Sequence, residues 1–207
     1  MPARKQKVKE KATEERIFEA ARAVFYENGF DGARMQEIAR RARINHSLLH
    51  YYFRSKGKLF DTVFRKAAFE LIPPVLEILR RDLPLLEKID SFVDCYVAMI
   101  YANPHLPAFI LQELRRNPDA LRQFAGEAAG GVFAELRAEI ERAASRGKIR
   151  SIRPEHLFAN VIAMCVFPVI AQPMLQTVFD IDGAGYDGFL VERGEVVKTF
   201  IRNALVP

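Results

Sequence analysis

The sequence predicts an all-α protein in which a small N-terminal domain precedes a larger helical domain. Three observations support this prediction. Apolar residues recur in about nine segments at the three- and four-residue spacing of one helix face. Two of the shortest segments flank a tight turn, which indicates a helix-turn-helix. Basic residues are concentrated in the same first third of the chain.

Length and composition allow a sizeable core. The chain has 207 residues, half of them apolar, which suits one or two domains. Cys95 and Cys165 lie far apart in apolar segments, so we expect buried thiols rather than a disulfide. There is no secretory signal pattern and no run of ~18 apolar residues that could span a membrane. We therefore expect a soluble, cytoplasmic protein that does not contact a membrane.

Charge divides the chain into two parts. Residues 1–66 carry 16 Lys and Arg against 8 Asp and Glu, a net charge of +8. The remaining residues carry 15 against 18, a net charge of −3. A basic domain joined to a slightly acidic one is typical of proteins that bind a polyanion through one domain.

The first segments indicate a compact three-helix unit. Residues 1–11 are predicted to be a basic flexible arm that neutralises phosphates, although a solvated tail that only aids solubility would look the same. Thr13 is a candidate N-cap for the first helix, which Asn28-Gly29 should end. Met35, Ile38, Ala39 and Ala42 mark one face of the second helix.

The third helix is short and should present polar groups to its surroundings. Asn45 is its predicted N-cap, and Leu49, Tyr52 and Phe53 can pack inward. The opposite face then carries His, Ser and Tyr side chains rather than Lys and Glu: His46, Ser47, His50 and Tyr51. Such groups can bond base edges or phosphates in a major groove, and Leu48 could meet a thymine methyl group. An ordinary solvated helix face is the alternative interpretation.

Six further segments are predicted to be helical. A fourth helix begins at Lys56 after a Ser55 cap, and Pro73-Pro74 should stop it or kink it sharply. The later helices are expected at residues 85–102, 109–114, 119–144, 154–175 and 189–205, with a Gly-rich loop at 180–188.

Residues 13–64 resemble the N-terminal domain of TetR-type transcriptional regulators, the TetR/AcrR family. The resemblance rests on three stretches: Thr13 to Phe30, Met35-Gln-Glu-Ile-Ala39, and Leu49-His-Tyr-Tyr-Phe-Arg-Ser-Lys-Gly-Lys-Leu-Phe60. It implies a homodimer with a helix-turn-helix DNA-binding domain at residues 12–56 (the motif itself at about 35–54). It also implies a ligand-binding and dimerisation domain at 57–207.

The resemblance assigns DNA-facing positions on this chain. By side-chain chemistry, we expect Gln36, His46, Ser47 and Leu48 at base edges, and Arg34, His50, Tyr51 and Lys56 mainly at phosphates. The complete expected set is Arg34, Gln36, Asn45, His46, Ser47, Leu48, His50, Tyr51 and Lys56.

Several positions depart from the family pattern. Arg43 occupies a turn position that is usually glycine, so a positive φ there would store strain of order 1 kcal/mol. Ala33-Arg34 replaces the usual Thr or Ser cap, and Gly57 replaces an acidic residue. His46-Ser47-Leu48 replaces the commoner Lys-Gly-Thr, so the operator sequence cannot be carried over.

The resemblance also implies a ligand pocket and a dimer interface. The pocket should lie in the second domain and bind a small hydrophobic or aromatic effector. Its candidate lining residues, each of which could instead be plain core, are Phe69, Phe92, Tyr96, Met99, Phe109, Gln112, Phe133, Met164 and Phe167. Dimerisation is expected through residues 154–175 and 189–205, although burial within one chain would give the same apolar pattern. Two-fold symmetry would make the operator a near-palindrome.

Other functional classes find little support in the sequence. His46 and His50 have a metal-ligand spacing but no adjacent Glu or evident third ligand, and the acidic loop at 180–187 lacks two required calcium ligands. No nucleophile–base pair or phosphate-binding loop is evident, so we expect neither catalysis nor a cofactor. The predicted function is a ligand-responsive repressor; an activator or an effector-independent DNA-binding protein remains the alternative.

Overall fold

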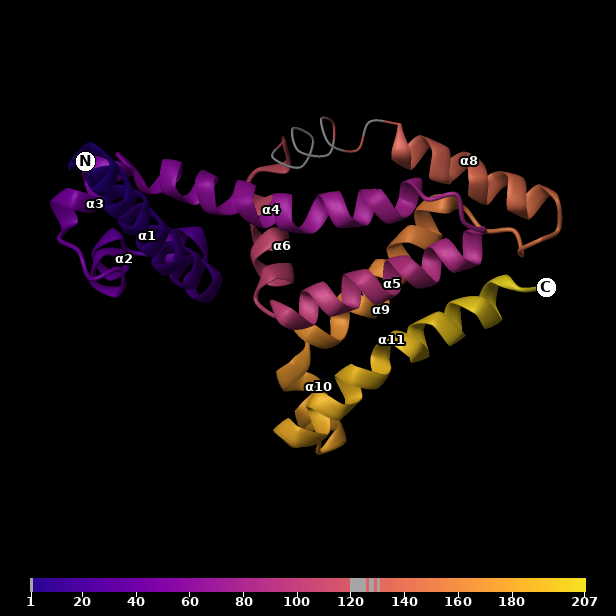
Figure 1. Ribbon diagram of the computed structural model, residues 1–207. Helices are drawn as coiled ribbons and strands as arrows, with labels where there is room; N and C mark the ends of the chain where they lie inside the picture. Colours follow the sequence, from indigo (N-terminus) through magenta and orange to yellow (C-terminus); the bar gives the residue numbers. More distant parts are fainter. Residues whose placement is uncertain (1, 120–125, 127–128, 130) are drawn as a thin grey trace. The chain divides into compact units, whose positions relative to one another are not determined.

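The computed structural model describes residues 2–119, 126, 129 and 131–207, with the side chains of residues 2–9 left out. This part of the chain is helical and contains no strand, which confirms the all-α prediction (Figure 1). Its contacts divide it into two compact units. The first comprises residues up to Phe69 together with Ala108–Pro118, and the second comprises Glu70–Pro107 and Asp119–Pro207. The first unit thus extends past the boundary predicted after residue 56.

The first unit is built from five helical segments around one apolar core. They are α1 (Pro2–Gly32), α2 (Met35–Arg41), α3 (His46–Tyr52), the beginning of α4 (Lys56–Arg80) and most of α6 (Leu106–Arg116). Phe25 and Phe60 meet edge to face at 4.9 Å between ring centroids, beside Ile17, Ile38 and Leu49, which are fully buried. Burying aromatic rings in this geometry adds to the apolar contribution of the core.

Helix α1 begins earlier than the sequence predicted. It starts at Pro2 rather than after Thr13, so the stretch expected to be a flexible arm is helical. Proline is favoured in the first turn of a helix, and the Lys, Gln, Glu and Ala residues that follow have high helix propensity. The expected end is confirmed by the backbone: Gly29 has φ 65° and ψ −174°, which interrupts the helical geometry.

Helix α4 continues through Pro73 and Pro74, so of the two predicted outcomes, a stop or a sharp kink, the structure excludes the stop. Each proline removes one backbone hydrogen bond to the carbonyl four residues earlier. Those carbonyls belong to Phe69 and Glu70, both of which are exposed, and water can therefore replace the missing donors.

In the second unit, three long helices contact one another pairwise. They are α5 (Leu85–Ala102), α9 (Pro154–Ile170) and α11 (Gly183–Leu205), with α8 (Val132–Ser145) against α5 and α9 (Figure 1). Val93, Cys165 and Val197 are fully buried in their shared core. The bounds of α5 match the prediction, and both cysteines are free thiols.

Part of the helix expected at 119–144 lies outside the described residues, and α8 begins at Val132. The part of the chain that follows differs from the prediction in two places. The helix expected at 154–175 is two helices, because α9 ends at Ile170 and α10 (Gln172–Phe179) begins with Pro173 in its first turn.

The expected Gly-rich loop at 180–188 is mostly helix. Asp180 ends α10 in the left-handed conformation at φ 52°, and the Asp182 carboxylate accepts a bond from the Gly185 amide at 2.7 Å. This cap starts α11 at Gly183 instead of residue 189. Tyr186, in the first turn of α11, is fully buried and donates its hydroxyl to the Pro168 carbonyl.

Candidate nucleic-acid interface

The turn between α2 and α3 has the geometry expected from the sequence. The Asn45 side chain accepts a hydrogen bond from the Leu48 amide at 2.7 Å, which confirms Asn45 as the N-cap of α3. Arg43 has φ 54°, the left-handed conformation that its usual glycine would adopt without strain. At the start of α2, Arg34 is the N-cap residue and makes no side-chain cap bond, as the missing Thr or Ser implied.

Helix α3 presents a polar face without acidic or basic side chains of the Asp, Glu, Lys or Arg type. Its core contact is Leu49, which is fully buried. His46, Ser47, His50 and Tyr51 are all exposed, Tyr51 to 79%. The rings of His46 and His50 lie 4.6 Å apart on successive turns, and Tyr51 meets Tyr52 edge to face. The face therefore offers donors, acceptors and rings that no intramolecular contact occupies fully.

The remaining candidate residues differ in how available they are. Arg34 and Gln36 are exposed at the start of α2, whereas Leu48 is half-buried. The side-chain oxygen of Asn45 accepts the hydrogen bond of the helix cap, so its side-chain amide nitrogen remains available to donate to a ligand. Asn45 and Leu48 belong to the cap and first turn of α3, whereas Arg34 and Gln36 lie at the opposite end of α2 from the turn to α3.

Lys56 has a structural role that the sequence did not reveal. Its Nζ atom donates to the Asp31 carbonyl at 3.2 Å and lies 4.8 Å from the Phe30 ring centroid. The side chain is half-buried and ties the start of α4 to the end of α1. Next to it, Ser55 accepts from the Lys58 amide at 3.2 Å, which confirms the predicted cap.

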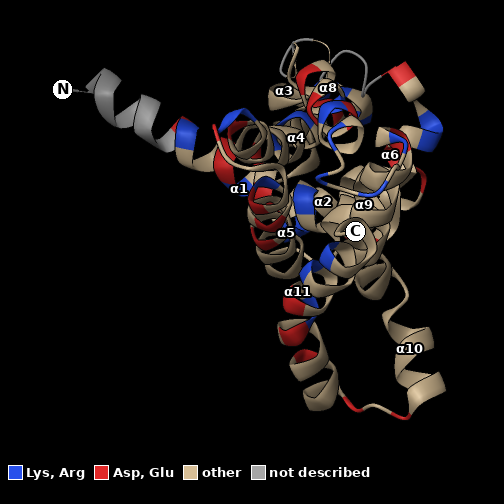
Figure 2. Cartoon of the chain, turned by 90° about the vertical axis from the view of Figure 1, so that its right-hand side faces the viewer, with Lys and Arg blue, Asp and Glu red and all other residues tan. Residues whose placement is uncertain are grey.

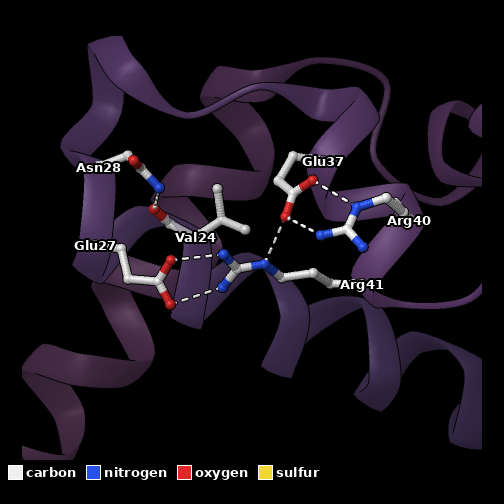
Figure 3. A network of polar contacts seen from close by, with 6 residues as sticks. All are labelled: Val24, Glu27, Asn28, Glu37, Arg40 and Arg41. Carbon is white, nitrogen blue, oxygen red and sulfur yellow. Dashed lines mark hydrogen bonds and ion pairs between the residues drawn. The ribbon is translucent and has the colours of Figure 1, made fainter.

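Four charged side chains join α1 to α2 beside the helix-turn-helix (Figure 3). Glu37 accepts from Arg40 at 2.7 and 2.8 Å and from Arg41 at 2.8 Å. Arg41 also forms a bidentate pair with Glu27, at 2.6 and 2.7 Å. Hydrogen bonds from Arg40 and Arg41 hold the pKa of Glu37 at about 2, and those from Glu27 and Glu37 raise the pKa of Arg41. The i, i+3 and i, i+4 spacing from Glu37 was the available sequence signal for part of this network.

Helix α6 packs in the first unit, although the sequence placed two of its residues in a ligand pocket of the second domain. Phe109 is buried with its ring centroid 4.7 Å from Tyr26 and 5.3 Å from Phe60. The Arg116 guanidinium lies 4.2 Å from the Phe30 ring centroid and is paired with Glu113, a buried carboxylate. Gln112 is exposed and approaches Gly29.

The other candidate pocket residues do not gather in one place. Phe92 lines an apolar cavity of about 40 Å³, together with Lys88, Leu136 and Phe158. Tyr96 stacks on Phe92 at 5.5 Å, and burial raises its pKa to about 12. Phe69, Phe133 and Phe167 are exposed, and Met99 and Met164 are half-buried.

The surface of the second unit exposes many large apolar side chains near the C-terminus. Helix α10 carries no charged residue along its length, and the turn that joins it to α11 contains acidic residues (Figure 2). The exposed apolar side chains of α9, α10 and α11 include Phe167, Ile170, Met174, Val178, Phe179, Val191, Val196 and Phe200.

Among the described residues, no three His, Cys, Asp or Glu side chains gather as metal ligands. No single described helix has both the length and the apolar character to cross a membrane; α9 and α10 meet these criteria only jointly, with a bend of 75° between them.

Comparison with known proteins identifies the family. Residues 17–63 match the family model of bacterial regulatory proteins, tetR family. The HTH-type transcriptional repressor SCO4008 of Streptomyces coelicolor is 47% identical over 60 residues, 29% of this chain and 31% of that protein. The crystal structure of SCO4942 from the same species has the same fold, with a TM-score of 0.65 at 21% identity over 93% of this chain and 98% of that one. The HTH-type transcriptional repressor NicS of Pseudomonas putida is 31% identical over 165 residues, 75% of this chain and 74% of NicS. The chain therefore belongs to the TetR family of transcriptional regulators.

Proposed function

We propose that this protein is a repressor that a small effector releases from a near-palindromic operator. The observation that carries the proposal is the exposed face of α3, which offers His46, Ser47, His50 and Tyr51 on a strongly basic unit. A solvated helix face is usually rich in Lys and Glu, whereas the donors and acceptors of His, Ser and Tyr side chains suit base edges. The relatives SCO4008 and NicS carry the name of repressors, which favours repression over activation.

Within this proposal, the side chains divide by chemistry. Gln36, His46, Ser47 and Leu48 contact base edges, and Arg34, His50 and Tyr51 contact phosphates. Asn45 and Lys56 act mainly by holding α3 and the start of α4 in place, because the Asn45 side-chain oxygen caps α3 and Lys56 Nζ already donates to the Asp31 carbonyl. This division lowers the expected direct contribution of Lys56 compared with the sequence-based assignment.

The DNA-binding form is proposed to be a dimer through α9, α10 and α11, which cover the segments 154–175 and 189–205 expected from the family. The exposed Phe167, Met174 and Phe200 support this interface, because a single chain leaves them in water. Two α3 helices at a separation of ~34–36 Å would reach successive major grooves. The operator would then consist of two inverted half-sites.

The effector is proposed to enter the second unit at the cavity beside Phe92. The cavity holds roughly one water-sized group in its present form, so a ligand must open it further. Its single charged lining residue among those described is Lys88, which donates to Glu139 at 2.6 Å and is largely buried. An apolar or aromatic effector with one polar atom would fill the cavity and reach this pair.

Helices α4 and α6 are proposed to couple effector binding in the second unit to DNA binding by the first. Helix α4 contributes residues to both units. Most of α6 belongs to the first unit, although residues of the second unit precede and follow it in sequence, and its Phe109 packs on Tyr26 and Phe60. Suppose that the effector binds more tightly to a dimer whose two α3 helices have a different separation. The affinity for DNA then falls by the ratio of the effector's affinities for the two arrangements. By linkage, DNA lowers effector affinity by the same factor.

A gel-shift titration with the upstream region of the protein's own gene tests the proposal. At low salt, we expect retardation of this duplex in preference to a scrambled duplex of equal length. In vitro transcription from the same region should fall as protein is added, and compounds that co-purify with the protein should restore it. Equal retardation of both duplexes would indicate a non-specific DNA-binding protein, and increased transcription would indicate an activator.

A further inference from the structure

The second unit contains a hollow that is separate from the cavity beside Phe92. It has a volume of about 400 Å³, within the range of small-molecule sites. Its walls come from the start of α5, the end of α8, the turn that follows α8, and α11. These four segments belong to the same compact unit, so the hollow does not depend on how the two units are placed.

Basic groups dominate the rim of this hollow. Arg142, Arg146, Lys148 and Arg202 line it, against two carboxylates, Glu87 and Glu139. Positive charge is therefore in excess in a unit whose sequence is slightly acidic overall. A concave surface with charges of one sign concentrates ligands of the opposite sign.

Some of these charged side chains form ion pairs within the chain, whereas three of the cations do not. Glu139 accepts from Lys88 at 2.6 Å, and Arg202 donates to Asp90. Arg142, Arg146 and Lys148 have no ion pair with any side chain in the described parts of the chain, and all three are exposed. Three cations at one rim are free to bond an anion from solution.

The floor of the hollow is apolar. Leu85 and Ile149 are buried there, and Leu86 and Ala143 are half-buried. Such a floor suits a carbon skeleton, whereas a bare inorganic ion would leave it in water. The combination of apolar floor and cationic rim therefore selects an organic anion.

We propose that this hollow is a second small-molecule site, which binds a compact organic anion through Arg142, Arg146 and Lys148. The anionic head group is a carboxylate or a phosphate, both of which arginine binds with two parallel hydrogen bonds. The apolar body of the ligand lies on Leu85 and Ile149. Glu139 lines this hollow and its partner Lys88 lines the cavity beside Phe92, so one ion pair separates the two sites.

Calorimetric titration of the full-length protein with benzoate, phenyl phosphate and benzamide tests this site. Benzoate or phenyl phosphate should bind, with affinity falling as NaCl is raised, whereas the neutral isostere benzamide should bind at least about tenfold more weakly. Preference for benzoate would identify a carboxylate site, and preference for phenyl phosphate a phosphate site. Equal binding of benzamide, or binding of none of the three, would overturn the proposal. No DNA is needed, so the result is independent of the proposed repressor function.

Matched charge variants locate the binding. Arg146→Gln with Lys148→Gln should weaken binding of the preferred anion at least about tenfold. Arg16→Gln with Arg150→Gln removes the same charge from exposed residues that do not line the hollow, and should leave affinity nearly unchanged. Arg142→Gln alone provides an independent variant if the first pair alters folding. Equal weakening by the hollow and control pairs would show a general charge effect and overturn the assignment.

Discussion

Two short helices, α3 and α10, show how differently this chain uses exposed surface. They have 7 and 8 residues, and neither contains Lys, Arg, Asp or Glu. Helix α3 buries Leu49, and α10 has no buried residue. Yet α3 exposes His46, Ser47, His50 and Tyr51, while the exposed residues of α10 include Met174, Val178 and Phe179.

This contrast separates two kinds of partner. Both helices lack the charged groups that normally solvate a helix face, so both faces are unusual for a surface exposed only to water. Hydrogen-bonding groups retain their value in a wet groove of DNA, whereas apolar side chains gain free energy only when another apolar surface excludes water. The type of exposed group, rather than its exposure alone, therefore distinguishes the proposed DNA-binding surface from the proposed subunit interface.

The largest expected effect comes from placing charge on the apolar surface. Met174→Asp with Phe200→Asp should give monomers at micromolar concentration, because each carboxylate would lose its hydration in the interface. Operator binding should weaken more than about 100-fold, since one α3 helix would remain for each binding event. Sedimentation velocity and gel shifts measure the two effects.

Leu111→Asp with Phe133→Asp is the matched control, because both residues are exposed and lie on α6 and α8. It should leave the dimer intact. A Met174→Asp, Phe200→Asp protein that remains dimeric would show that α10 and α11 are not the interface.

The next effect concerns the polar face of α3. His46→Ala with Tyr51→Ala should weaken operator binding at least about 30-fold and leave the dimer unchanged, because the two lost base or phosphate contacts are worth about 1–3 kcal/mol each. Thr62→Ala with His105→Ala, two exposed polar residues outside α3, should bind as the wild type does. If the α3 variant binds the operator with wild-type affinity, this face of α3 does not contact DNA.

Local signals in the sequence were sufficient for the helix-turn-helix. The Asn45 cap and the Ser55 cap each depend on residues within one helical turn, and the structure has both. The bounds of α5 were predicted for the same reason, since prolines and an apolar stripe define that helix locally. The positive φ at Arg43 was suggested only by the glycine that the family pattern usually has there.

Contacts between residues far apart in the sequence could not be predicted from such local signals. Phe109 was expected in a ligand pocket, yet it packs on Tyr26 and Phe60, more than 40 residues away in sequence. Nothing in the spacing of α6 distinguishes this contact from any other apolar face. The prediction for the start of α11 was wrong for another reason. The glycines at 183 and 185 suggested a loop, but the Asp182 cap and the burial of Tyr186 outweigh their low helix propensity.

A smaller effect is expected at Arg43. Arg43→Gly should raise the free energy of unfolding by up to about 1 kcal/mol, because glycine adopts φ 54° without the Cβ clash. The gain is limited by the greater flexibility of glycine in the unfolded chain. Urea denaturation measures it, and Arg40→Gly within α2 should instead destabilise by about 1 kcal/mol. If both substitutions destabilise equally, backbone strain at Arg43 is absent.

The smallest effect is the pH dependence of the α1–α2 network. Hydrogen bonds from Arg40 and Arg41 lower the folded-state pKa of Glu37 from 4.5 to about 2, so its carboxylate stabilises the fold above pH 4.5 and this contribution disappears as pH falls from 4.5 to 2. Urea midpoints of the wild type and Glu37→Gln should therefore differ at neutral pH and converge near pH 2. The difference should be small and decrease with salt, because the side chains are solvent-accessible. Glu192→Gln, at an exposed position of α11, should follow the wild type throughout. A Glu37→Gln midpoint equal to that of the wild type at neutral pH and low salt would mean that the network in Figure 3 does not stabilise the packing of α2 on α1.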